Sequence, residues 1–311
     1  MLNNKIISYI YQNIFHEEYL IEQLLQLSIG NCTKIDVIRQ FKIRQNWGKV
    51  MRLIKENQLE NIIYQTIYKN HFEKYIPQDI LKKINVDNLV MQYIISLQKK
   101  EFEGIIINFS KKRIDFLVMK TFLHKKSLQL DAISKIRNDL DLLIPIHQFK
   151  RAVKLLFYLG YKYYPDHYEK KGKSSIEEID FYIPQSQEIF KKNEISIELH
   201  TTIVDTFDYF KETFSLHDNQ IITECLYKDH IYINKKNPRI KVFSPTSLLI
   251  SLFLHSFIQH NFQSSSSLYE AFVILKKYNK EIDWQKIEKQ MIVWKLNQYF
   301  IIYVILLHDF F

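Results

Sequence analysis

Apolar positions in the first hundred or so residues follow the spacing of amphipathic helices. Between residues 47 and 68 they recur every three or four positions, which gathers them on one helix face. These positions are Val50, Met51, Ile54, Leu59, Ile62, Ile63 and Ile67. A second such stretch, 78–109, follows Pro77, a residue that can open a helix. We therefore predict an N-terminal helical region over residues 1–109.

Short apolar runs replace the helical spacing after residue 109 and indicate a small α/β core over 110–205. Strands are predicted over 114–119, 139–144, 178–183 and 194–199. Residues 121–134 leave room for a helix and a loop between the first two strands. Residues 147–159 return to helical spacing, and Gly160 behind them is typical of a helix end.

Helical spacing resumes at Pro245. We assign residues 206–311 to a C-terminal helical region. Ser244-Pro245-Thr246 is a helix start signal, because Ser caps helices and Pro is favoured in their first turn. The apolar run 299–307 is predicted to belong to a buried C-terminal helix. The predicted fold class is therefore α+β, with a small mixed-sheet core flanked by N- and C-terminal helical regions.

Composition narrows the chemistry that the chain can support. Hydrophobic residues make up 47% and charged residues 25%, which is ordinary for a globular protein. The five glycines lie too far apart for a G-x-G-x-x-G or Walker loop, which excludes dinucleotide-fold and P-loop chemistry. Cys32 and Cys225 cannot build a disulfide framework or a Cys-rich zinc site, and they favour a reducing cytoplasm. No apolar run reaches membrane-spanning length, so no membrane insertion is expected.

Two carboxylates stand out inside the second predicted strand. Asp139 and Asp141 are two positions apart, so they share a face while Leu140 and Leu142 point into a core. Neighbouring carboxylates stay ionised when a cation lies between them, and Mg²⁺ shared with substrate phosphates is the usual one. The pair is thus a candidate phosphoryl- or nucleotidyl-transfer centre. The alternative is an exposed edge strand with solvated aspartates.

Glu198 is a third candidate, in the alternating segment Ile195-Ser196-Ile197-Glu198-Leu199-His200. If this strand neighbours the Asp strand, Glu198 completes a cluster of three carboxylates. Two metal ions held there can activate an attacking hydroxyl and neutralise a departing pyrophosphate. All-oxygen ligands suit Mg²⁺, whereas zinc would want more His or Cys. The formal charge of +9 suits a polyanionic substrate such as a nucleotide or RNA.

Several motifs occur in a fixed order around these residues. They are Asn46-Trp47, Met119-Lys120-Thr121, Arg137-Asn138-Asp139-Leu140-Asp141, Leu159-Gly160-Tyr161, Ile197-Glu198-Leu199-His200, Ser244-Pro245, Leu254-His255 and Ile282-Asp283-Trp284. Together they resemble the uncharacterised bacterial nucleotidyltransferase family with the polymerase-β-type fold, over nearly the whole chain. Their order and spacing are more specific than a lone D-x-D motif.

The resemblance implies Mg²⁺-dependent transfer of a nucleoside monophosphate from an NTP donor to an acceptor, with release of pyrophosphate. Asp139 and Asp141 would hold two Mg²⁺ ions, and Glu198 would join them at the ion that activates the acceptor. Catalysis would rest on positioning and charge neutralisation. The acceptor is open among small molecules, peptides or proteins, and RNA.

The resemblance also implies a phosphate-binding segment before the acidic pair. Lys120 stands where the family has the Lys of a Lys-Gly pair, at the turn that faces the nucleotide phosphates. Thr121 replaces the Gly, and Gly is what lets backbone N–H groups approach a triphosphate closely. The Thr hydroxyl either contacts phosphate or marks an altered site. Arg137 and Lys135 are both candidates for the basic residue just before the acidic pair.

Histidines are less specific signals. His200 could orient Glu198, contact substrate or serve a structural role. His255 and His260 are five positions apart, a poor spacing for a shared metal, and are predicted to pack against neighbouring helices. The basic segment 167–173 either binds phosphate or an acidic acceptor, or is a solvated loop.

Two further functions stay open. Thr121 in place of Gly would fit a non-catalytic nucleotide-binding or interaction module. The positive charge would fit a toxin-like nucleotidyltransferase that modifies tRNA.

Overall fold

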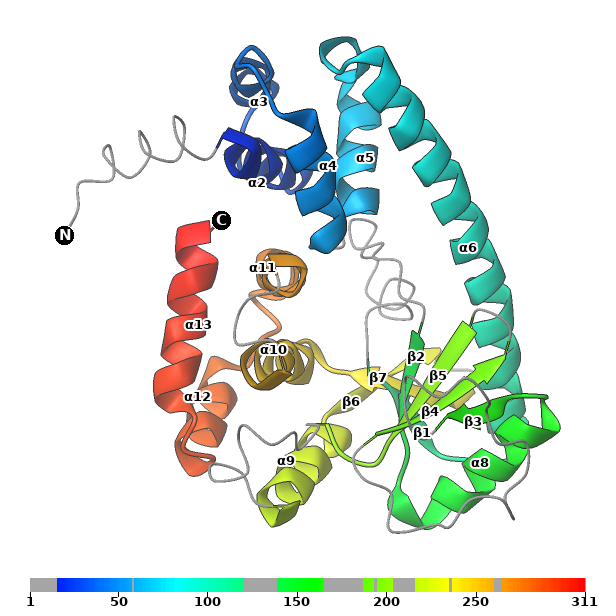
Figure 1. The fold of residues 1–311 in the computed structure, drawn as a ribbon. Helices are drawn as coiled ribbons and strands as arrows, with labels where there is room; N and C mark the ends of the chain where they lie inside the picture. The colour runs from blue at the N-terminus through cyan, green and yellow to red at the C-terminus, as the bar shows by residue number, and fades with distance from the viewer. Residues whose placement is uncertain are drawn as a thin grey trace.

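The computed structural model describes residues 16–57, 59–119, 139–164, 187–192, 195–203, 216–234, 237–259 and 265–310. These residues form an α+β fold in which helices precede and follow a mixed sheet along the chain, as the sequence predicted (Figure 1). The predicted strand 178–183, the segment 121–134 and the basic segment 167–173 lie outside the described residues.

Within the described residues the sheet has seven strands in the order β3-β4-β5-β2-β1-β7-β6. Their bounds are β1 (Phe116–Val118), β2 (Asp139–Leu143), β3 (Lys162–Tyr164), β4 (Gln187–Lys192), β5 (Ile195–His200), β6 (His230–Asn234) and β7 (Asn237–Phe243). β2 pairs with β5 and β1 with β7 in parallel, whereas the β1–β2, β3–β4, β4–β5 and β6–β7 pairs are antiparallel. β2 therefore lies in the middle of the sheet.

The N-terminal helices are α2 (His16–Ser28), α3 (Lys34–Phe41), α4 (Trp47–Glu56), α5 (Glu60–Asn70), the 3₁₀ turn η1 (Glu73–Tyr75) and the long α6 (Gln78–Lys111). Asn46 caps α4 by accepting a hydrogen bond from the Lys49 N–H, and Pro77 precedes α6 as predicted. The predicted helical stretch 47–68 divides into α4 and α5. The division occurs at Asn57, whose side-chain amide donates to the Leu53 carbonyl and ends α4.

Helix α8 (Phe149–Tyr158) follows the 3₁₀ turn η2 (Ile146–Gln148), and α9 (Leu216–Lys228) precedes β6. Gly160 ends α8 with a left-handed φ of 85°, which confirms its predicted role. The C-terminal helices are α10 (Pro245–Leu254), the π-helical turn η4 (His255–Gln259), α11 (Ser265–Tyr278), α12 (Trp284–Val293) and α13 (Asn297–Phe310). Ser244 caps α10 and Pro245 occupies its first turn, as the start signal predicted.

Two hydrophobic cores pack against opposite faces of the sheet because strand side chains alternate. On one face Val118, Leu140 and Ile197 pack with the C-terminal half of α6 and with α8. On the other face Leu117 and Leu143 pack in a core shared with the N- and C-terminal helices. Figure 1 shows α6 running from the N-terminal helices down to the sheet, so this one helix contributes to both cores.

The sheet differs from the prediction in its extent. β3, β4, β6 and β7 were not predicted, and β6 and β7 lie beyond residue 205, in a segment assigned to the C-terminal helical region. Helix α13 is also less buried than expected: Tyr303 and Leu307 are buried, but Ile301 and Ile305 are exposed. Among the described helices, none has the length and apolar character needed to cross a bilayer.

Candidate active site

The register between β2 and β5 brings the predicted acidic residues together. Asp141 lies directly opposite Glu198, and Asp139 lies opposite Ser196. Parallel neighbours in register place such side chains about 5 Å apart on one face. Asp141 is 1% exposed and β2 has β5 and β1 as neighbours, so the alternative of an exposed edge strand with solvated aspartates is wrong for Asp141.

His200 joins the two carboxylates from the end of β5. Its Nε2 atom lies 3.1 Å from Oδ1 of Asp141 and 3.6 Å from Oε2 of Glu198. His200 pairs with Leu143, so it reaches Asp141 diagonally across the two strands. One ligand atom from each of these three residues lies within 4.8 Å of the other two. We call Asp141, Glu198 and His200 the β2–β5 cluster.

The three ionisable side chains of the β2–β5 cluster are all buried. Glu198 is 8% exposed and His200 is 3% exposed, so all three groups are removed from bulk water. Burying an ionised carboxylate costs several kcal/mol unless an opposite charge or hydrogen bonds compensate for it. The hydrogen bond between His200 and Asp141 supplies part of that compensation. A divalent cation would supply much more.

The donor set fits such a cation. Carboxylate oxygens are the ligands that Mg²⁺ prefers, and imidazole nitrogen is a common ligand of other divalent metals. Adjacent ligands of an octahedral ion with bonds of about 2.1 Å lie about 3.0 Å apart. The separations of 3.1 and 3.6 Å from Nε2 to the two carboxylates are close to that value. The β2–β5 cluster can therefore hold a metal after small side-chain adjustments.

Several predicted residues lie outside the described residues: Lys120, Thr121, Lys135, Arg137 and His260. For Asp139 the structure describes the backbone, which begins β2 and pairs with Ser196. Because Asp139 and Asp141 are two positions apart on the same strand, the backbone assigns them to the same face of the sheet. His255 is the first residue of the π-helical turn η4, and it is not among the residues of the β2–β5 cluster.

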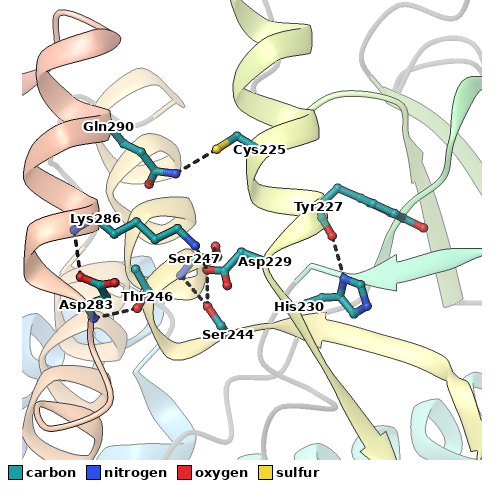
Figure 2. Close-up of polar contacts among 10 residues, drawn as sticks. All are labelled: Cys225, Tyr227, Asp229, His230, Ser244, Thr246, Ser247, Asp283, Lys286 and Gln290. Atoms are coloured by element: carbon teal, nitrogen blue, oxygen red, sulfur yellow. Dashed lines mark hydrogen bonds and ion pairs between the residues drawn. The ribbon is translucent and has the colours of Figure 1, made fainter.

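A half-buried polar network joins the sheet to the C-terminal helices and was missed in the sequence. The carboxylate of Asp229 accepts hydrogen bonds from the hydroxyls of Ser244 and Ser247, both at 2.6 Å, and pairs with Lys286 at 2.9 Å (Figure 2). Burial works against ionisation of Asp229, but these three contacts outweigh it and lower its pKa. The network fixes the exit of β7 into α10 and ties both to α12.

A basic cleft of about 730 Å³ lies between α4 and α6 in the N-terminal helical region. Its lining includes the cationic residues Arg52, Lys55, Lys82 and Lys83 and the carboxylate Asp87. Exposed cations in a concave surface attract polyanions by focusing the electrostatic potential. None of these side chains was singled out in the sequence, because Arg and Lys are spread along the whole chain.

Residues 44–311 match the model of the family described as uncharacterised nucleotidyltransferase. The chain belongs to this family. The match spans α4 to α13 and so includes every strand of the sheet and the β2–β5 cluster. As a member of the uncharacterised nucleotidyltransferase family, the protein is a transferase of phosphorus-containing groups, which confirms the nucleotidyltransferase assignment from sequence. No curated protein and no solved structure matches the chain.

Proposed function

We propose that this protein transfers a nucleoside monophosphate from an NTP to an acceptor and releases pyrophosphate, at a Mg²⁺-dependent centre of the polymerase-β type. The observation that carries this proposal is the placement of Asp141 opposite Glu198 on one buried face of the central strands. Membership of the nucleotidyltransferase family supports the reaction class.

In this proposal Asp139, Asp141 and Glu198 hold two Mg²⁺ ions. Bound there, the ions would neutralise charge on the NTP phosphates and make the acceptor hydroxyl a better nucleophile. The chain itself contributes positioning. Asp141 and Glu198 are fixed on paired strands, so their carboxylates keep one spacing without a loss of conformational entropy at each turnover. Their burial also excludes water that would compete with the acceptor.

The segment before β2 would supply the phosphate contacts. Lys120 immediately follows Met119, whose backbone N–H donates to the Asp141 carbonyl. Lys120 is therefore joined by a single peptide bond to a residue that contacts the acidic strand. We propose that Lys120 and Thr121 contact the triphosphate and that Arg137 supports it from the other end of the same segment.

The acceptor we favour is RNA, and the basic cleft is the observation that supports it. Arg52 and Lys55 on α4 line this cleft together with Lys82 and Lys83 on α6, and clustered cations of this kind attract nucleic-acid phosphates. The reducing cytoplasm is the proposed location, consistent with Cys32 and Cys225, which are free thiols.

The test uses the full chain with Mg²⁺, each α-³²P-labelled NTP in turn, and either total RNA or a pool of small metabolites. We expect labelled RNA from the wild-type protein and none from the Asp141→Asn variant. Label in the metabolite fraction or on the protein itself would reject the RNA acceptor and keep the transfer reaction. NTP binding in calorimetry without any labelled product or pyrophosphate would reject catalysis and favour the non-catalytic nucleotide-binding module.

A further inference from the structure

We infer that His200 is a direct metal ligand, so that one ion of the centre is held by nitrogen as well as oxygen and prefers Mn²⁺ to Mg²⁺. This inference rests on the proposed function, because it assumes a metal ion between Asp141 and Glu198. It adds a ligand that neither the acidic motifs nor the family match assigns, and it changes which cation the centre selects.

The position of the His200 ring supports its role as a ligand. Nε2 of His200 is the atom that approaches both carboxylates, at 3.1 Å from Asp141 and 3.6 Å from Glu198. A histidine that only oriented one carboxylate would need to approach only that one. The three donor atoms instead converge, and an ion that contacts the two carboxylates lies within bonding reach of Nε2.

The backbone of His200 is held as firmly as that of a residue inside the sheet. Its register partner is Leu143, and its carbonyl accepts a hydrogen bond of 2.8 Å from the Ile144 N–H. Glu198 and His200 are two positions apart on β5, so they share the face that Asp141 occupies on β2. A ligand fixed in this way needs little reorganisation when the metal arrives.

Ligand chemistry gives the metal preference. Mg²⁺ accepts oxygen donors almost exclusively, whereas Mn²⁺ accepts carboxylates and also binds imidazole. A donor set of two carboxylates and one imidazole therefore favours Mn²⁺ over Mg²⁺ at this ion. The same set without His200 would lose that preference and retain Mg²⁺ binding through oxygen.

The experiment is Mn²⁺ binding to the full chain, followed by electron paramagnetic resonance. The amplitude of the free Mn²⁺ signal gives the dissociation constant. Pulsed measurements on bound Mn²⁺ detect nitrogen ligands directly. We expect ¹⁴N modulation in the wild-type protein. His200→Gln should lose it and bind Mn²⁺ at least about 10- to 100-fold more weakly, the loss typical even for an outer-shell partner of a ligand, with a smaller change for Mg²⁺ in competition. His71→Asn is the matched control, because His71 is an exposed left-handed helix cap where Asn is tolerated.

Two further measurements separate the possible failures. If His200→Gln does not fold, labelling the wild-type protein with ¹⁵N-histidine should replace the ¹⁴N pattern and show that the nitrogen ligand is a histidine. Among the described residues, His200 is the histidine grouped with Asp141 and Glu198. Mn²⁺ that binds in an Asp141-dependent way without a nitrogen signal would overturn the role of His200 and leave the proposed function standing. Mn²⁺ binding that is unchanged in Asp141→Asn would overturn both.

Discussion

Asp141 on β2 and Glu198 on β5 lie directly opposite one another, and both carboxylates are buried. They are 57 positions apart in the sequence, and only the parallel pairing of β2 with β5 brings them together. Two acidic groups on adjacent buried positions repel one another unless a cation compensates. Their pairing therefore favours a site that is completed by a cation over one that serves stability alone.

Gly160 and Gly104 give opposite predictions for the same substitution. Gly160 has a φ of 85°, so Gly160→Ala forces a side chain into the left-handed region and should destabilise the fold by about 1 kcal/mol. Gly104 lies inside α6, where an added Cβ would meet nothing within 4 Å. Gly104→Ala should therefore stabilise by about 0.5–1 kcal/mol. Urea denaturation of both variants measures the change in unfolding free energy. A loss of stability in Gly104→Ala would contradict the open space around this position.

Asp229→Asn should destabilise the protein by about 1–3 kcal/mol, because the variant lacks the charge that Ser244, Ser247 and Lys286 satisfy. Burial opposes ionisation of Asp229, and the hydrogen bonds and the Lys286 charge lower its pKa despite that burial.

The lowered pKa of Asp229 also fixes the pH dependence of this effect. The carboxylate stabilises the fold above its unfolded pKa of about 3.9, and that contribution is lost as the pH falls through the lower folded value. The difference in unfolding free energy between wild type and Asp229→Asn should be constant from pH 7 to about pH 5 and shrink below pH 4. A difference that grows on acidification would show that the pKa is raised instead.

Reversal of charge in the basic cleft should weaken RNA binding. The double variant Lys82→Glu, Lys83→Glu should lower affinity for total tRNA about tenfold or more and reduce the slope of affinity against salt concentration. Lys99→Glu, Lys100→Glu is the matched control, since this exposed pair lies further along the same helix and outside the cleft. Equal losses in both variants, measured by filter binding, would show that general charge rather than the cleft binds RNA.

Local patterns predicted those parts of the fold that depend on neighbouring residues. The apolar runs over 114–119 and 139–144 predicted β1 and β2, and alternation predicted β5. β6 and β7 were missed although His230-Ile231-Tyr232-Ile233-Asn234 alternates in the same way as β5. In the sequence only Lys235 and Lys236 separate the two strands, and this pair is not one of the dipeptides that signal a hairpin turn.

The sequence named Asp141 and Glu198 as candidates, but it did not predict how their side chains lie relative to each other. The spacing of Asp139 and Asp141 assigns them to one face, since that relationship is local. The pairing of β2 with β5 is not local, and no pattern within either strand specifies its register. The position of His200 between the two carboxylates follows from that register, and for this reason its role was left open in the sequence.

If the carboxylates of the β2–β5 cluster support nucleotidyl transfer, the initial rate of pyrophosphate release should depend on them. The assay contains Mg²⁺, the NTP and the acceptor fraction that give labelled product with the wild-type protein. Asp141→Asn should lower the rate on the order of 10³-fold or more with little change in melting temperature. Asp79→Asn, an exposed aspartate in the first turn of α6, should retain the wild-type rate. A wild-type rate in Asp141→Asn would show that the β2–β5 cluster is not the catalytic centre.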